Sequence, residues 1–180
     1  MEAKISCPYG MSADEPDELL CEGAELVRFE QYDAFMEKQH AMLACVGVHD
    51  EDGACAYLPA LEAELQRYQE QAYVLDPFLE RLVTPVAQTM RAQVLESGCM
   101  CMAPVARLLY MYTKVRGYKV VSRFFPHQVR EMPLLLDALE RFESPTWECL
   151  YVLLLWLSSV VLVPFPLDRG TPSPSERIHR

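Results

Sequence analysis

Residues 150–163 read Leu-Tyr-Val-Leu-Leu-Leu-Trp-Leu-Ser-Ser-Val-Val-Leu-Val, a run without a charged side chain that is followed by Pro164. Such a run must be kept from water, and it constrains the fold more than any other part of the sequence. Uncharged residues extend from Cys149 to Leu167, which approaches the ~20 residues that span a bilayer. Pro164 and Pro166 shorten the helical part to roughly 15–17 residues, or about 25 Å. We therefore expect the inner helix of a helical stack, with a membrane span as the alternative.

The rest of the chain shows a helical pattern that is interrupted at turn residues. Apolar side chains recur at spacings of three and four, and no segment of useful length alternates in the way that a strand does. The spacing predicts helices over residues 24–46, 57–72, 77–96, 104–117, 118–125 and 127–142, and a last helix capped by Ser144 or Thr146. Short turns make successive helices antiparallel. We predict an all-α fold, a HEAT- or armadillo-like α-solenoid of antiparallel helix pairs.

Several residues are predicted to mark the ends of these helices. Residues 49–53 read His-Asp-Glu-Asp-Gly and predict an exposed turn. Asp76 and Pro77 are suited to the first turn of the third helix, because the carboxylate accepts from free N–H groups and proline has no N–H to satisfy. Pro85 should kink that helix or split it near Val83. Gly117 is suited to a left-handed position at the end of the fourth helix.

The composition along the chain predicts three regions. Residues 1–22 are acidic with little periodicity and predict a disordered leader without the features of a secretory signal. Residues 23–165 form the helical-repeat domain, and residues 166–180 form a disordered tail rich in proline and serine. An apolar helix near the end of a stack must be covered by a further layer. We therefore expect either that this chain is the N-terminal part of a longer solenoid or that a partner protein covers the helix. Seven cysteines without framework spacing indicate free thiols and a cytoplasmic protein.

The charge is distributed unevenly. Residues 1–80 contain 18 Asp and Glu against 4 Lys and Arg, whereas residues 81–180 contain 8 against 12. The net charge of −10 argues against nucleic acid as a partner. Residues 97–130 contain no acidic residue, and five residues within this basic segment are candidates for partner binding: Lys114, Arg116, Tyr118, Lys119 and Arg123. Either they pair within the molecule with the acidic first half, or they form an exposed patch that orients an acidic partner.

Catalytic signatures are missing from the sequence. It contains no phosphate-binding Gly-x-x-x-x-Gly-Lys loop and no Gly-x-Ser-x-Gly elbow, and its four histidines are scattered. A single Cys-x-Cys at residues 99–101 is a weak metal signal. We therefore predict a binding protein without enzymatic activity, cofactor or metal.

Four blocks resemble, in the same order, the N-terminal region of the tubulin-folding cofactor D family. They lie at residues 68–80, 109–119, 124–129 and 147–158, followed by Pro164-Phe165. The most specific are Thr113-Lys-Val-Arg-Gly-Tyr-Lys119 and Leu153-Leu-Leu-Trp-Leu-Ser158. The resemblance covers roughly residues 58–165.

The resemblance implies a large helical-repeat chaperone that captures β-tubulin and takes part in assembly and disassembly of the αβ-tubulin heterodimer. It also implies tubulin-folding cofactors C and E and an Arf-like small GTPase as partners, with a GTPase-activator role towards tubulin in the presence of those cofactors. The implied location is the cytoplasm, with the cytoskeleton and the centrosome as sites of association. Two alternatives are a membrane-associated helical protein anchored by residues 150–163 and a nonfunctional truncated product.

Overall fold

Helices and turns make up the part of the chain that the structure describes. The structure is a computed structural model, and it describes residues 28–95, 102–141 and 145–162. All helices lie in the unit Gln31–Arg180, and only residues 28–30 of the unit Met1–Glu30 are described. The helices are α1 (Tyr32–Gly47), α2 (Glu51–Arg67), α3 (Leu79–Leu95), α4 (Met102–Arg116), α5 (Tyr118–Val121), α6 (Met132–Arg141) and α7 (Trp147–Val161), with the 3-10 segments η2 (Ala72–Phe78), η3 (Ser122–Phe124) and η4 (Val129–Glu131).

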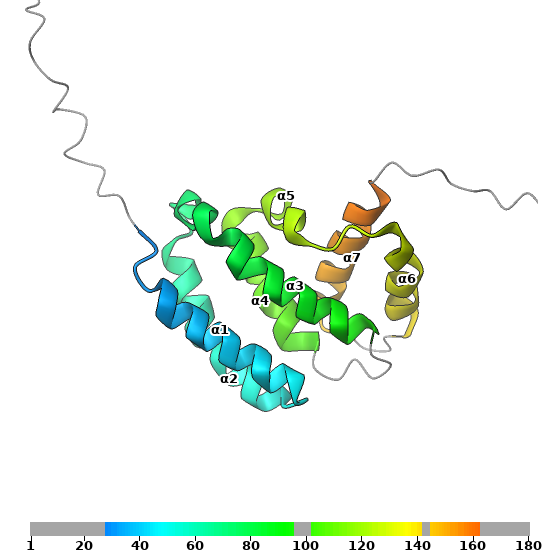
Figure 1. The fold of residues 1–180 in the computed structure, drawn as a ribbon, viewed down its shortest axis with the longest axis horizontal. Coiled ribbons are helices and arrows are strands. Elements are labelled where there is room, and N and C mark those ends of the chain that lie inside the picture. Colours follow the sequence, from blue (N-terminus) through cyan, green and yellow to red (C-terminus); the bar gives the residue numbers. More distant parts are fainter. Residues whose placement is uncertain (1–27, 96–101, 142–144, 163–180) are drawn as a thin grey trace, which may run out of the picture. The chain divides into compact units, whose positions relative to one another are not determined.

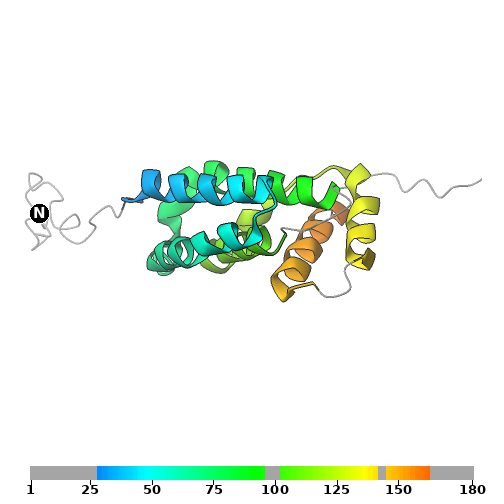
Figure 2. The same cartoon turned by 90° about the horizontal axis from the view of Figure 1, so that it is seen from below.

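Three helix pairs follow one another in this unit (Figure 1). α1 packs on α2, α3 on α4, and α6 on α7. In Figure 2, α1 and α3 lie in one layer, and α2, α4 and α7 lie in the other. Within the second layer α2 contacts α4 and α4 contacts α7, so each pair is joined to the next along the same side. The predicted all-α fold of antiparallel helix pairs is confirmed for the described residues, which contain no strand.

α2 begins earlier than predicted, because Asp50 caps it. Oδ1 of Asp50 accepts a hydrogen bond of 2.9 Å from the backbone N–H of Gly53. A Cβ at residue 53 would lie 2.1 Å from Oδ2 of Asp50, so glycine leaves room for this cap. The prediction of an exposed turn over residues 49–53 is therefore wrong for its last three residues. The helix also ends at Arg67 rather than at residue 72.

α3 continues without interruption through Pro85, so of the two predicted outcomes, a kink or a split near Val83, the split is wrong. A proline inside a helix removes one backbone hydrogen bond, at a cost of about 3 kcal/mol. Leu82, Val83 and Val86 surround the proline in sequence, and their side chains are fully buried. Full burial of such a side chain contributes about 1.5–3 kcal/mol, so three of them outweigh the missing bond.

Asp76 and Pro77 lie in η2 and not, as predicted, in the first turn of α3. The Asp76 carboxylate instead accepts two hydrogen bonds from the Arg116 guanidinium, from Nε to Oδ1 and from Nη2 to Oδ2, the second at 2.7 Å. This bidentate pairing lowers the pKa of Asp76 and raises the pKa of Arg116, in both cases chiefly through the side-chain hydrogen bond. The pair therefore ties η2 to the last turn of α4.

α4 is the central helix of the unit, and ten of its 15 residues are buried. The hydroxyl of Tyr112 on α4 donates a hydrogen bond to Oε1 of Gln39 on α1, and Nε2 of Gln39 donates to the carbonyl oxygen of Leu82 on α3 at 2.9 Å. Gln39 and Tyr112 are both fully buried, so each satisfies a polar group of the other that water cannot reach. Burial also raises the pKa of Tyr112 well above its ordinary value.

Two predictions concern the chain after α4, the conformation of Gly117 and a helix start at His127. Gly117 has a positive φ of 95°, as a left-handed residue would, but its ψ of 137° lies outside the left-handed helical region that was predicted for it. The predicted helix start at His127 is wrong, because α6 begins at Met132 after the short segment η4. Pro133 is the second residue of α6, where its missing N–H costs no hydrogen bond, so it does not interrupt the helix.

The apolar run forms α7, and only one face of this helix is buried. Thr146 caps it, with its hydroxyl oxygen accepting from the N–H of Cys149 at 3.4 Å. The buried face consists of Cys149, Val152, Leu153, Trp156 and Val160. The Trp156 indole N–H donates to the carbonyl oxygen of Pro126 at 2.7 Å and so fixes the segment before η4 against α7. Across the described ranges, no helix combines the length and the apolar character that a bilayer crossing needs.

Replacement of Tyr112 by Phe is expected to destabilise the unit by about 1–3 kcal/mol, because Oε1 of Gln39 is then buried without a donor. The double variant Gln39→Leu/Tyr112→Phe removes both polar partners and is expected to recover part of that loss. Urea unfolding of the two single variants and the double variant measures the coupling. Strictly additive effects would show that the two groups do not depend on each other.

Loss of the Asp76–Arg116 pair is expected to change the dependence of stability on pH. Pairing lowers the pKa of Asp76 in the folded protein. The pair therefore contributes fully to the free energy of unfolding above the pKa of an unfolded aspartate, about 3.9, and this contribution is lost as the pH falls through the lower pKa of the folded protein. Asp76→Asn is therefore expected to cost up to about 1 kcal/mol at pH 7 and to reduce the slope of unfolding free energy against pH below about pH 4. Asp137→Asn, which breaks the exposed pair with Arg141, is the matched control and should cost about 0.5 kcal/mol or less.

Candidate partner-binding surface

The candidate residues from the basic segment lie on the last turn of α4, on α5 and on η3. Gly117 separates α4 from α5, and the two helices contact each other. Lys114, Tyr118, Lys119 and Arg123 are exposed, whereas Arg116 is half-buried. These four exposed residues are called the basic α5 surface below.

Two arginines of the basic segment are engaged within the molecule. Arg116 is held by Asp76 as described above, and Nη2 of Arg107 lies 3.1 Å from Oε2 of Glu62 on α2. Both acidic partners belong to the acidic first half of the chain. These two arginines therefore form ion pairs with the acidic first half, as one of the two alternatives expected. The pair of Arg116 with Asp76 also positions η2.

The other three cations of the candidate set are free to meet a partner. Lys114, Lys119 and Arg123 form no ion pair with any residue that the structure describes. The carbonyl oxygen of Arg123 contacts Nε2 of His127 at 3.2 Å, but its guanidinium is not involved. Three positive charges beside the half-exposed ring of Tyr118 give a surface that can attract carboxylates and present an aromatic anchor.

Two further exposed residues, Tyr73 and Arg130, were not among the candidates from the sequence. Tyr73 lies on η2 and is 66% exposed, and the Asp76–Arg116 pair holds η2 against α4. Arg130 on η4 is also exposed, and its Nε donates to Oε1 of Gln128 at 2.9 Å. No spacing rule identifies Tyr73, because its relation to the basic segment depends on a pair between residues far apart in sequence.

The described ranges contain free thiols but no cluster of metal-ligating side chains. No group of three His, Cys, Asp or Glu there could hold a metal ion. Cys45, Cys55 and Cys149 are free thiols, and burial raises the pKa of Cys149. Cys99 and Cys101 lie outside the described residues, as do the predicted leader and tail.

Comparison with known proteins identifies the family. Residues 65–177 match the model of the tubulin-specific chaperone D-like ARM repeat. Over 104 residues the chain is 34% identical to the tubulin-folding cofactor D of Schizosaccharomyces pombe, which covers 58% of this chain and 9% of that relative, so the chain spans only a small part of its length. No solved structure matches the chain.

These matches confirm the resemblance carried by the four sequence blocks. They also confirm the armadillo-like character of the stacked helix pairs, because the matched residues include α3 to α7. The chain belongs to the tubulin-specific chaperone D-like, ARM-repeat family.

Proposed function

We propose that this chain is a helical-repeat module of a tubulin-folding chaperone and that its basic α5 surface binds β-tubulin. Membership of the family and the name of the Schizosaccharomyces pombe relative support the tubulin assignment. One observation carries the choice of surface: Lys114, Lys119 and Arg123 are exposed and free of ion pairs within the described ranges. These residues also lie within the stretch that the family model matches.

The surface is suited to an acidic protein partner. Free cations on an otherwise acidic chain raise the rate at which a negatively charged partner arrives in the correct orientation. Tyr118 adds a rigid aromatic ring, which is a frequent anchor in protein interfaces. Arg116 remains in the candidate set as a positioning residue, because its pair with Asp76 fixes the end of α4 from which the surface projects.

The wider role follows the resemblance. The module takes part in assembly and disassembly of the αβ-tubulin heterodimer in the cytoplasm, together with cofactors C and E and an Arf-like small GTPase. GTP hydrolysis stimulated in such a complex is carried out by tubulin, and this chain acts as a scaffold. The helical-repeat domain comprises residues 23–165 in this proposal, between the acidic leader at residues 1–22 and the tail at residues 166–180.

The triple charge reversal Lys114→Glu/Lys119→Glu/Arg123→Glu tests the surface. It is expected to weaken binding of purified β-tubulin to the chain at least tenfold, or by about 1.4 kcal/mol, because attraction becomes repulsion. Biolayer interferometry with the immobilised chain measures the affinity, and the wild-type affinity should fall as the salt concentration rises.

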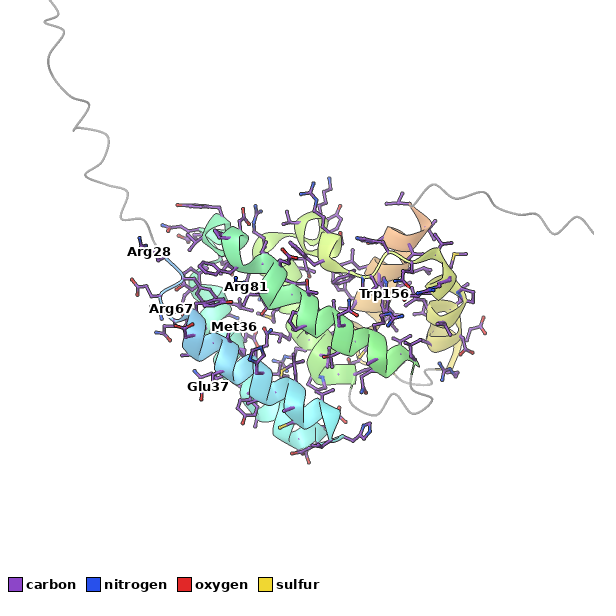
Figure 3. The ribbon with its side chains drawn as sticks, in the orientation of Figure 1. Arg28, Met36, Glu37, Arg67, Arg81 and Trp156 are labelled. Carbon is purple, nitrogen blue, oxygen red and sulfur yellow. The ribbon has the colours of Figure 1, made fainter. Side chains whose placement is uncertain are left out.

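The control reverses three exposed cations that are not part of this surface, Lys38→Glu/Arg67→Glu/Arg81→Glu on α1, α2 and α3 (Figure 3 labels Arg67 and Arg81). Of these, Arg67 pairs with Glu64 at 3.3 Å. Both variants change the net charge by the same amount, so a specific surface requires a loss in the first variant only. Equal losses would indicate nonspecific attraction. Unchanged affinity in the first variant would contradict the assignment of the basic α5 surface.

A further inference from the structure

Arg123 is the one member of the basic α5 surface that lies beyond α5, on the segment that connects α5 to α6 (Figure 1). This segment comprises residues 122–131, and its only regular elements are the short 3-10 turns η3 and η4. Residues 125–128 between these turns belong to no helix, so the repeated hydrogen bonds of a helix do not fix their backbone. The position of Arg123 therefore depends on tertiary contacts of the segment.

Trp156 on α7 makes one of these contacts (labelled in Figure 3). Its indole N–H donates a hydrogen bond of 2.7 Å to the carbonyl oxygen of Pro126, and its side chain is 2% exposed. Proline favours an extended residue before it, and Phe125 has a φ of −77° and a ψ of 153°. Phe125 is also buried, and η3 contacts both α3 and α7. The chain is thus held at Phe125 and Pro126 immediately after η3.

A second contact connects this point to Arg123. Nε2 of His127 lies 3.2 Å from the carbonyl oxygen of Arg123, four residues earlier in the chain. His127 follows Pro126 directly, so the bond from the indole fixes the backbone from which the imidazole reaches back. Trp156 therefore acts on the backbone of Arg123 through Pro126 and its neighbour, although the buried indole itself is out of reach of a partner.

The other end of the segment is held by a buried ion pair. Nε of Arg91 on α3 lies 2.6 Å from Oε1 of Glu131, and Glu131 is 3% exposed. Oε2 of the same carboxylate has no hydrogen-bond partner among the described residues. Burial of a charged carboxylate is costly without a partner, so Glu131 depends on Arg91 for its position. The segment is thus anchored to α7 near its middle and to α3 at its end.

A cation that is already in position binds a partner more tightly than a mobile one, because ordering a mobile group on binding costs free energy. Lys114 is positioned by the long helix α4, and Lys119 by α5, which contacts α4. Arg123 lies on a single 3-10 turn before the nonhelical residues. Among the three free cations, Arg123 therefore depends most on the contact that Trp156 makes.

We propose that Trp156 is a positioning residue for partner binding, which holds Arg123 in the basic α5 surface through the carbonyl oxygen of Pro126. This inference rests on the proposed function, because it requires that Arg123 contacts β-tubulin. It assigns part of the affinity to a buried side chain of α7 that does not touch the partner. It also makes α7 a support of a surface that α4, α5 and η3 form.

Trp156→Phe tests this role, because it keeps an aromatic ring in the apolar site and removes the N–H donor. Its affinity for purified β-tubulin, measured by biolayer interferometry with the full chain, is expected to fall about threefold to tenfold. Tyr112→Phe is the matched control, since it also removes one buried donor, which bonds Gln39 on α1 instead. The control should keep the wild-type affinity. Urea unfolding establishes that both variants are folded under the binding conditions.

A double-mutant cycle separates positioning from a general loss of stability. In an Arg123→Ala background, Trp156→Phe should cause no further loss of affinity, because the cation that it positions is absent. In a Lys114→Ala background the full loss should remain, since Lys114 lies on α4. Equal losses in the two backgrounds would show that Trp156 acts on the fold as a whole, and this overturns the inference.

Amide hydrogen exchange of the free chain tests the same contact without tubulin. Amides of residues 123–128 are expected to exchange faster in Trp156→Phe than in the wild type and at the wild-type rate in Tyr112→Phe. Unchanged exchange in Trp156→Phe would show that the indole does not hold the segment and overturns the inference.

Failure of the inference and failure of the proposed function give different results. If the triple charge reversal weakens binding of β-tubulin and Trp156→Phe does not, the inference alone is overturned. If the triple charge reversal leaves binding unchanged, the proposed function is overturned and the inference with it.

Discussion

The buried hydrogen bonds of Gln39 are the constraint on which the helix arrangement depends. This one side chain joins α1 to Tyr112 on α4 and to the backbone of α3, in a core that is mostly apolar. Apolar packing alone tolerates shifts of one helix along another, but a buried amide must find its partners at fixed positions. The polar contact therefore specifies how the first helix pair is set against the second, and α4 then provides the surface on which α7 packs.

The basic segment divides into residues that hold the fold and residues that are left for a partner. Arg107 and Arg116 reach back to carboxylates of the acidic first half and fasten α2 and η2 to α4. Lys114, Lys119 and Arg123 are exposed around the turn at Gly117, where no described acidic side chain pairs with them. Five basic residues close together in sequence thus have two different roles, and only the three-dimensional arrangement separates them.

Local signals allowed the sequence to predict α4, a positive φ at Gly117, a cap at Ser144 or Thr146 and the helical nature of residues 147–161. Predictions failed where distant contacts decide the structure. Burial of the side chains around Pro85 keeps α3 continuous. Asp76 binds Arg116, 40 residues away in sequence, instead of capping α3. The candidate surface was foreseen as a charged segment, but its free members could not be separated from Arg116 without that pair.

The two tryptophans give this chain a pair of built-in optical probes. Trp156 is 2% exposed and bonded to the carbonyl oxygen of Pro126, whereas Trp147 projects from the exposed face of α7. The fluorescence of the first indole reports on the core, and the quenching of the second by a soluble agent reports on what lies against that face. Because the chain has no other tryptophan, loss of folding and occupation of α7 produce separable spectral changes in the unlabelled protein.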